Sequence, residues 1–322
     1  MDAPNRRPTL HDVARLAGVS HMTVSRVVRG SHAVASPTVE RVRRAIAKLS
    51  YRSDPALSAL AAYRTRGGGR GQGSVLAYLD CDGDAYSDLV RHGAQAEAER
   101  LGYALESHRI QPAPAFQRRL ARTLFHRGVR GLLFGPSNTP WTFEGWNWPA
   151  FAAVSLGALS HQPAMNTVAM DYFENASRAF ELLRTAGCRR IALAIDSALE
   201  SRTGHRWIGG YTAQSPQPQL IYDQPKISTD AFRRWIKQHR VDGVLTIHDR
   251  VWRAVSSLGV PVVFLNEFEC PAELPHFVTD SQRIGVEGVR LIHHQILNHD
   301  FGLPAQTRTV TLQSALVGGR AI

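Results

Sequence analysis

Residues 9–51 read TLHDVARLAGVSHMTVSRVVRGSHAVASPTVERVRRAIAKLSY. Thr9 is placed to cap a helix, and Asp12 puts a carboxylate in its first turn, where the helix dipole favours negative charge. Apolar residues then recur on one helical face until Gly18, which supplies the left-handed residue that ends the helix. Ser20 caps a second helix at once. Two short helices joined by a tight glycine-containing turn predict a helix-turn-helix, whose second helix enters the DNA major groove.

The second helix presents a polar face opposite its valines. Its outward residues are predicted to be His21, Met22, Thr23, Ser25, Arg26 and Arg29. Ser36 as N-cap and Pro37 at the first helical position predict a third helix. The basic residues of that helix lie opposite its buried apolar stripe.

Most of the excess positive charge lies in the first quarter of the chain. Residues 1–73 contain 13 Lys and Arg against 4 Asp and Glu, a net charge of +9, whereas the whole chain of 322 residues has a net charge of +11. A basic run by itself is usually a solvated surface. Next to a helix-turn-helix it indicates binding to the phosphate backbone of a nucleic acid.

Residues 9–51 resemble the DNA-binding domain of the lactose-repressor (LacI/GalR) family of bacterial transcription regulators. The resemblance runs without a gap from TLHDVARLAGVSHMTVSRVVRG to Leu49-Ser50-Tyr51. It implies a homodimer that binds a pseudopalindromic operator in double-stranded DNA. We expect base contacts from His21, Met22 and Arg26, of which Arg26 is the best candidate for a bidentate bond to guanine. The phosphate contacts are expected from Ser20, Thr23, Arg29 and Thr38.

A short helix is predicted after this motif, opening at Asp54 and Pro55. It is too short to be stable alone. In the family resembled, the corresponding hinge helix pairs with its twin from a second subunit and inserts a leucine into the minor groove. Leu60 falls on the position of that leucine, and Leu57 is the second predicted hinge residue. Leu57 stands where the family more often has a small residue, and Ser53-Asp54-Pro55 also departs from the usual family hinge. A glycine-rich linker, GGGRGQG, follows.

From Ser74 onward, short apolar runs alternate with helical stretches, which predicts parallel α/β layers. Strands are predicted at 74–80, 104–110, 131–135, 152–156, 191–195, 243–247 and 262–265. Helices are predicted at 87–101, 114–127, 174–186, 229–238 and 251–258. The rhythm fits two Rossmann-like halves, with strand 152–156 opening the second, and the resemblance implies a periplasmic-binding-protein-like core with a ligand cleft between two subdomains.

The predicted organisation therefore has three parts. Residues 1–52 form an all-α helix-turn-helix domain, residues 53–73 form the hinge helix and the glycine-rich linker, and residues 74–322 form an α/β domain for effector binding and dimerisation. For the cleft, the resemblance and the strand ends imply an effector-binding set of Arg206, His248, Asp249, Asn266, Asp171 and Gln282. A guanidinium suits vicinal hydroxyls or a carboxylate. A surface role remains the alternative for Arg206, and a helix cap or hinge role for Asn266, Asp171 and Gln282.

Other patterns exclude several classes of protein. The chain has no G-x-S-x-G elbow, P-loop or H-E-x-x-H motif, and no G-x-G-x-x-G after a strand, so no enzyme is predicted. Its three cysteines are far apart and its histidines are scattered, so we expect no metal or other cofactor. Trp141, Trp146 and Trp148 are interpreted as a hydrophobic patch or subunit contact, with a sugar-stacking platform as the alternative.

The sequence thus predicts a DNA-binding transcription regulator, a repressor, whose operator affinity is controlled by a carbohydrate effector. Because no segment approaches the ~20 apolar residues of a membrane span and no export signal is evident, we expect it in the bacterial cytoplasm, associated with the nucleoid. One alternative is a ligand-independent DNA-binding protein with a vestigial cleft. A transporter's solute-binding protein is disfavoured because it would need an export signal and would not need residues 1–66.

Overall fold

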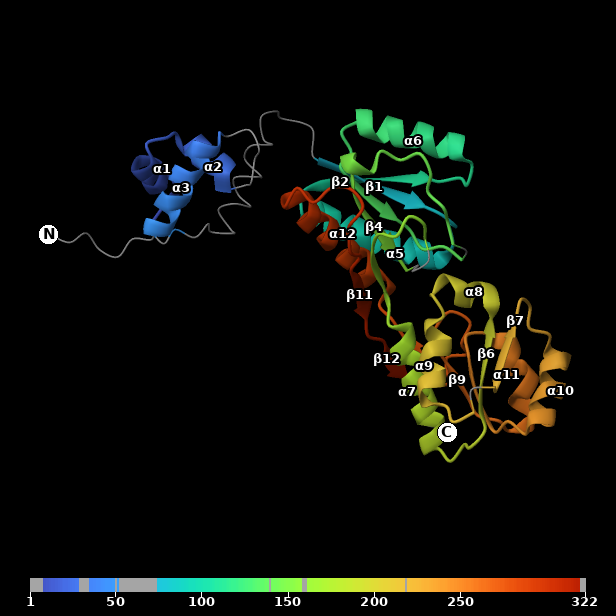
Figure 1. Ribbon diagram of the computed structural model, residues 1–322. Helices are drawn as coiled ribbons and strands as arrows, with labels where there is room; N and C mark the ends of the chain where they lie inside the picture. Colours follow the sequence, from blue (N-terminus) through green and yellow to red (C-terminus); the bar gives the residue numbers. More distant parts are fainter. Residues whose placement is uncertain are drawn as a thin grey trace. The chain divides into compact units, whose positions relative to one another are not determined.

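The computed structural model describes residues 8–28, 35–49, 51, 74–138, 140–157, 161–217 and 219–318. It divides into two compact units, Met1–Gln72 and Gly73–Ile322 (Figure 1).

The first unit contains α1 (Leu10–Ala17), α2 (His21–Val28) and α3 (Ser36–Lys48). Thr9 and Asp12 form the predicted capping box, in which the Asp12 carboxylate accepts the Thr9 backbone N–H at 2.8 Å. Gly18 ends α1 in the left-handed conformation with φ 62°. Ser20 Oγ then accepts the Thr23 backbone N–H at 3.1 Å, so the predicted boundary between α1 and α2 is confirmed.

The core of this unit is small and aliphatic. Val13, Val24 and Val42, one from each helix, are completely buried. The predicted start of α3 was wrong by one residue, since Ala35 and not Ser36 is the N-cap. No side chain in the described part of the chain caps this helix. The fixed φ of Pro37 suits any position in the first turn, and the helix therefore begins one residue earlier.

The second unit contains two six-stranded sheets. The first has the order β11-β5-β4-β3-β1-β2, with all neighbours parallel. Its strands are β1 (Ser74–Asp80), β2 (Tyr103–Arg109), β3 (Gly131–Phe134), β4 (Ala152–Leu156), β5 (Asn166–Met170) and β11 (Thr309–Leu312). The helices packed on it are α5 (Ala85–Arg100), α6 (Pro114–His126) and α12 (Ser281–Leu297), and a short 3-10 helix, η1 (Trp148–Ala150), precedes β4.

The second sheet has the order β12-β10-β9-β8-β6-β7, and only β12 runs antiparallel to its neighbour within the described residues. Its strands are β6 (Ile191–Asp196), β7 (Ile221–Gln224), β8 (Gly243–Thr246), β9 (Val262–Phe264), β10 (His276–Val278) and β12 (Ala315–Val317). Its helices are α7 (Tyr172–Thr185), α8 (Ser197–Arg202), α9 (Arg206–Gln214), α10 (Thr229–His239), α11 (Asp249–Val255) and η2 (Ser256–Leu258).

Each sheet is covered by helices on both faces, and its central strands are therefore buried throughout. The strand predicted at 152–156 was assigned to the wrong half, because β4 pairs with β3 and β5 in the first sheet. The chain crosses between the subdomains three times, after β5, after β10 and between β11 and β12. A simple split of the sequence into two halves could not anticipate these crossings.

The tryptophan cluster belongs to the core of the first subdomain. Trp146 is 6% exposed, stacks on Trp148 with centroids 5.8 Å apart, and meets Phe134 edge-on. The buried Gln117 side chain accepts the Trp146 Nε1–H at 3.3 Å. The hydrophobic-patch interpretation is confirmed, because Trp146 is too buried to serve as a sugar platform.

Candidate nucleic-acid interface and ligand cleft

One face of the N-terminal end of α2 is buried, and the opposite face is exposed to solvent. Val24 is completely buried, whereas Met22 is 51% exposed and His21 is also exposed. The His21 ring stacks on that of His11 in α1, with centroids 5.0 Å apart. Ser20 is exposed, and its hydroxyl lies 2.9 Å from that of Thr23. A helix N-terminus with exposed polar side chains is suited to contact phosphates and base edges.

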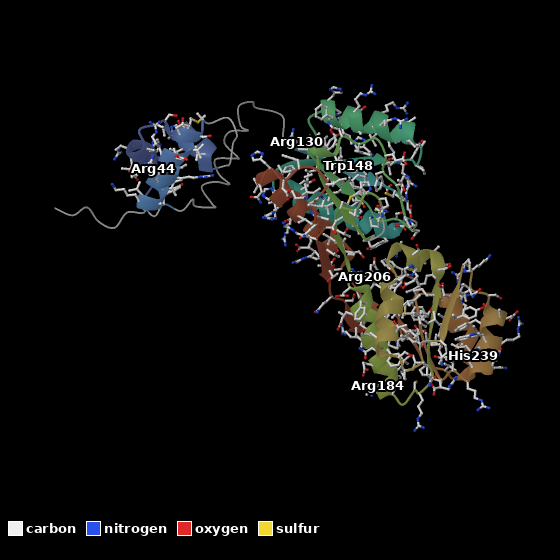
Figure 2. The ribbon with its side chains drawn as sticks, in the orientation of Figure 1. Arg44, Arg130, Trp148, Arg184, Arg206 and His239 are labelled. Carbon is white, nitrogen blue, oxygen red and sulfur yellow. The ribbon has the colours of Figure 1, made fainter. Side chains whose placement is uncertain are left out.

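Several predicted DNA contacts cannot be located. Arg29, Leu57 and Leu60 lie outside the described residues, and so does the side chain of Arg26. Thr38 is half-buried in the first turn of α3, where its backbone N–H donates to Ala35 at 2.9 Å. The exposed basic side chains of α3 are Arg41, Arg43, Arg44 (Figure 2) and Lys48.

The strand ends of the second subdomain bring two predicted effector residues together. His248 follows β8 and Asn266 follows β9, and these strands are parallel neighbours. His248 is 2% exposed, its Nδ1 lies 3.4 Å from the Glu269 carboxylate, and its Nε2 has no hydrogen-bond partner among the described residues. Burial, helped by the nearby Arg250 charge, lowers the pKa of His248, so the imidazole is neutral. Asn266 is also buried, and its side-chain oxygen accepts the Phe268 N–H at 3.3 Å.

The other predicted residues have more local roles. Asp249 begins α11 and pairs with Arg253 at 2.6 Å. Asp171 caps α7 by accepting the Glu174 N–H at 3.1 Å, which is the alternative role considered for it. Gln282 is exposed in the first turn of α12, where its backbone carbonyl packs against Gly93 of α5.

Two arginines flank the turn between α8 and α9. Arg206 is the first residue of α9; it is exposed, and its guanidinium makes no hydrogen bond or ion pair to the described residues (Figure 2). Arg202, at the end of α8, is instead 7% exposed. Burial raises the pKa values of Tyr86 and Tyr172, and the Arg202 charge only partly opposes this rise. Because Tyr86 belongs to the other subdomain, Arg202 lies where the two subdomains meet.

Aromatic groups bridge the two subdomains. Tyr86 of α5 meets Phe268 of the second subdomain edge-on, with ring centroids 5.1 Å apart. The Tyr172 hydroxyl donates to the Gly157 carbonyl after β4 at 2.7 Å.

The Tyr86 hydroxyl is buried without a hydrogen-bond partner in the described residues, as is one carboxylate oxygen of Glu267. Burial also raises the pKa of Glu267. Sequence reasoning missed Tyr86, Arg202 and Phe268, because only the fold brings them together.

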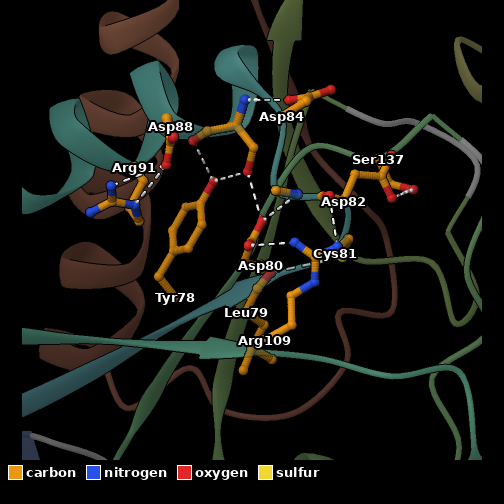
Figure 3. Close-up of polar contacts among 12 residues, drawn as sticks. Tyr78, Leu79, Asp80, Cys81, Asp82, Asp84, Asp88, Arg91, Arg109 and Ser137 are labelled. Carbon is orange, nitrogen blue, oxygen red and sulfur yellow. Dashed lines mark hydrogen bonds and ion pairs between the residues drawn. The ribbon is translucent and has the colours of Figure 1, made fainter.

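An acidic loop follows β1 in the first subdomain (Figure 3). Asp80 accepts the Ser87 hydroxyl at 3.0 Å and pairs with Arg109 at 3.1 Å. Asp84 caps α5 by accepting the Ser87 N–H at 2.7 Å, and Asp82 accepts the Asn138 N–H. Each carboxylate already has a donor, so this loop is preorganised. Among the described residues, no group of three or more His, Cys, Asp or Glu is placed to hold a metal ion.

Three buried polar side chains form a hydrogen-bonded cluster beside the three segments in which the chain crosses between the subdomains. The Asn175 side-chain amide, in α7, donates to Ser314 Oγ at 2.9 Å and to the Leu265 carbonyl at 3.3 Å. Ser314 Oγ in turn bonds the Thr279 hydroxyl. All three side chains are 3% exposed or less. These hydrogen bonds hold the three crossing segments together. A change in the angle between the subdomains must therefore bend the chain near this cluster.

Comparison with known proteins identifies the first unit. Residues 9–54 match the family model described as bacterial regulatory proteins, lacI family. The helix-turn-helix domain of this chain is of the lacI type. This confirms the resemblance found in the sequence. The HTH-type transcriptional regulator PtxS of Pseudomonas putida is 36% identical over 109 residues, which are 32% of this chain and 30% of that protein. Across the curated relatives that it matches here, the chain spans between 16% and 54% of their length.

Solved structures confirm the predicted fold class, an N-terminal helix-turn-helix followed by a periplasmic-binding-protein-like core. The lac repressor dimer bound to operator and the anti-inducer ONPF is 20% identical, with a TM-score of 0.58, over 98% of this chain and 99% of that one. The complex of the transcriptional regulator CelR with cellobiose is 20% identical, with a TM-score of 0.54, over 98% of this chain and 100% of that one. In the described part of this chain, no helix is long and apolar enough to cross a membrane.

Proposed function

We propose that this protein is a sequence-specific transcription repressor whose operator affinity is set by a carbohydrate bound between the two subdomains. It acts as a homodimer on a pseudopalindromic operator in the bacterial cytoplasm. The observation that carries the proposal is the capped helix-turn-helix of the lacI family, with the exposed start of α2, in one chain with a two-sheet core. Residues 1–52 bind DNA, residues 53–73 form the hinge, and residues 74–322 bind the effector and the second subunit.

Two features support a polar effector. His248 Nε2 is buried without a partner in the described residues at the end of β8, and in parallel sheets ligands bind at the carboxyl ends of the strands. The Arg206 guanidinium, which makes no hydrogen bond or ion pair within the described residues, suits vicinal hydroxyls or a carboxylate. The similar CelR structure contains cellobiose. Effector binding changes the angle between the subdomains, orders or disorders the hinge helices with Leu57 and Leu60, and so shifts DNA affinity.

Arg26→Ala is expected to weaken binding to the operator by about 1–3 kcal/mol per half-site while barely changing the affinity for random DNA. The reason is that a bidentate bond to guanine discriminates between bases, whereas phosphate contacts do not. Anisotropy titrations of operator and random duplexes at one salt concentration measure both affinities. Arg44→Ala, which removes an exposed charge of α3, is the control and should change both affinities by the same factor. An equal loss on both duplexes in Arg26→Ala rules out its role as a base reader.

One observation favours a second candidate, a ligand-independent DNA-binding protein. Tyr86 and Phe268 already touch across the subdomains, and the Tyr86 hydroxyl is fully enclosed. If this contact keeps the subdomains closed permanently, operator affinity is insensitive to every sugar. Phe268→Ala separates the candidates, because it should make a regulated protein more responsive to its sugar and leave an unregulated protein unchanged.

A further inference from the structure

Glu200 is an unusual carboxylate because it is 0% exposed and has no ion pair among the described residues. One of its oxygens accepts the backbone N–H of Ile208 at 2.8 Å, and the other accepts the Thr203 hydroxyl at 3.2 Å. A hydrogen bond from the Trp207 N–H also stabilises its charged form. Burying a charge is costly unless hydrogen bonds compensate it, and here backbone amides provide much of the compensation.

These amides belong to the first turn of α9. His205, the N-cap residue, is left-handed with φ 59° and makes no side-chain capping bond. The first turn of a helix leaves several N–H groups without partners, and the helix dipole favours a negative charge there. Glu200 therefore caps α9 from the preceding helix. Its own backbone carbonyl also accepts the His205 N–H at 3.1 Å, which holds the intervening turn.

The capped turn carries Arg206 at its first position and Trp207 at its second. Trp207 is completely buried and meets Tyr172 edge-on, with centroids 5.0 Å apart. Tyr172 in turn bonds Gly157 of the other subdomain. The position of this turn is thus linked to the place where the subdomains meet.

We infer that Glu200 is the positioning residue of the effector site: its carboxylate fixes the first turn of α9 and thereby holds Arg206 toward the effector. The inference rests on the proposed function, in which Arg206 contacts a carbohydrate. Glu200 itself does not touch the effector.

The affinity of this site for its effector should depend on the ionisation of Glu200 near neutral pH. Burial raises the pKa of Glu200 to about 7. Asp223 on β7 acts directly on Glu200, and Asp196 and His205 act on Asp223. The neutral Tyr172 on α7 is influenced by both Glu200 and Arg202, which lies on the same helix as Glu200. Above this pH the ionised carboxylate caps α9 fully, and below it the protonated group caps more weakly. Effector binding should therefore be tighter at pH 8 than at pH 6.

The test uses the full-length protein and the variants Glu200→Gln, Glu200→Ala and Arg206→Ala. The control is Glu181→Gln, which changes a surface carboxylate of α7 paired with Arg184. Amide hydrogen exchange of peptides covering 203–214 is measured without sugar. Release from operator DNA is then titrated with cellobiose, glucose and gluconate at pH 6 and pH 8.

We expect Glu200→Ala to speed exchange at 206–209 and to weaken the response to the active sugar about tenfold, as Arg206→Ala does. Wild type should respond several-fold more weakly at pH 6 than at pH 8, and Glu200→Gln should respond equally at both. Unchanged exchange in Glu200→Ala overturns the cap. Faster exchange with an unchanged sugar response overturns the positioning role. If none of the three sugars releases wild-type protein, the proposed function fails, and the exchange result alone decides the cap.

Discussion

Gly210→Ala is expected to destabilise the second unit by about 1–3 kcal/mol, whereas Gly209→Ala, one residue earlier in α9, is expected to stabilise it by about 0.5–1 kcal/mol. A Cβ at Gly210 would lie 2.2 Å from the backbone oxygen of Phe173 in α7, which cannot move without shifting that helix. A Cβ at Gly209 would meet only the Phe173 ring at 3.6 Å, an ordinary contact. Both substitutions gain the same helix propensity, so the close approach of α7 and α9 alone separates them.

Urea unfolding followed by tryptophan fluorescence measures both effects, since Trp207 lies in the same helix. The Gly209→Ala variant is the matched control. Equal stability of the two variants contradicts the packing described for α7 and α9.

The stability of the second unit is expected to fall with rising pH because of Glu200. The carboxyl has a pKa of about 7 in the folded protein and an ordinary value of 4.5 in the unfolded chain. Between these values the folded state holds a proton that the unfolded state has lost. The contribution is therefore complete below pH 4.5 and is lost as the pH rises through 7, and the difference of about 2.5 pH units corresponds to about 3 kcal/mol.

The measurement compares the unfolding free energies of wild type and Glu200→Gln between pH 4.5 and pH 8. The unfolding free energy of wild type minus that of the variant should fall by about 3 kcal/mol as the pH rises across this range. His161 acts in the opposite direction, because burial lowers its pKa to about 4 and its contribution is lost as the pH falls below 6.5. It is present in both proteins and cancels in the difference. A difference that is flat or rises with pH refutes the account of Glu200.

Local chemistry made the first unit predictable from its sequence. The Thr9 and Asp12 capping box, Gly18 and Ser20 fix α1 and α2 through bonds between residues close in the chain. Several elements of the second unit were also predictable, because β1 and α10 carry enough residues to show an apolar pattern. The prediction missed β10 and β12, whose three residues are too few to show a period, although it found the equally short β9. It also missed β5, which has five residues and is buried throughout.

The candidate cleft was less predictable than the fold. Similarity to the family pointed to Arg206. His248 was predicted from its place after a strand, although it stands where the family commonly has asparagine. Nothing local distinguishes Arg202 from the other arginines, and its burial depends on α8 meeting α5 from the opposite subdomain. Glu200 likewise looks like a surface residue of a short helix in the sequence. Its burial follows from the left-handed turn at Gly204 and His205, which folds α9 back over it.

Regulated binding to an operator is measured by fluorescence anisotropy with DNA from upstream of the protein's own gene and its neighbours. Titrations at fixed salt are run against excess random DNA, with and without cellobiose, glucose, sucrose and gluconate. We expect tight, competitor-resistant binding to one fragment and a change in that affinity with one sugar, by a factor of about 5–150. Binding to every fragment no tighter than to random DNA contradicts this expectation.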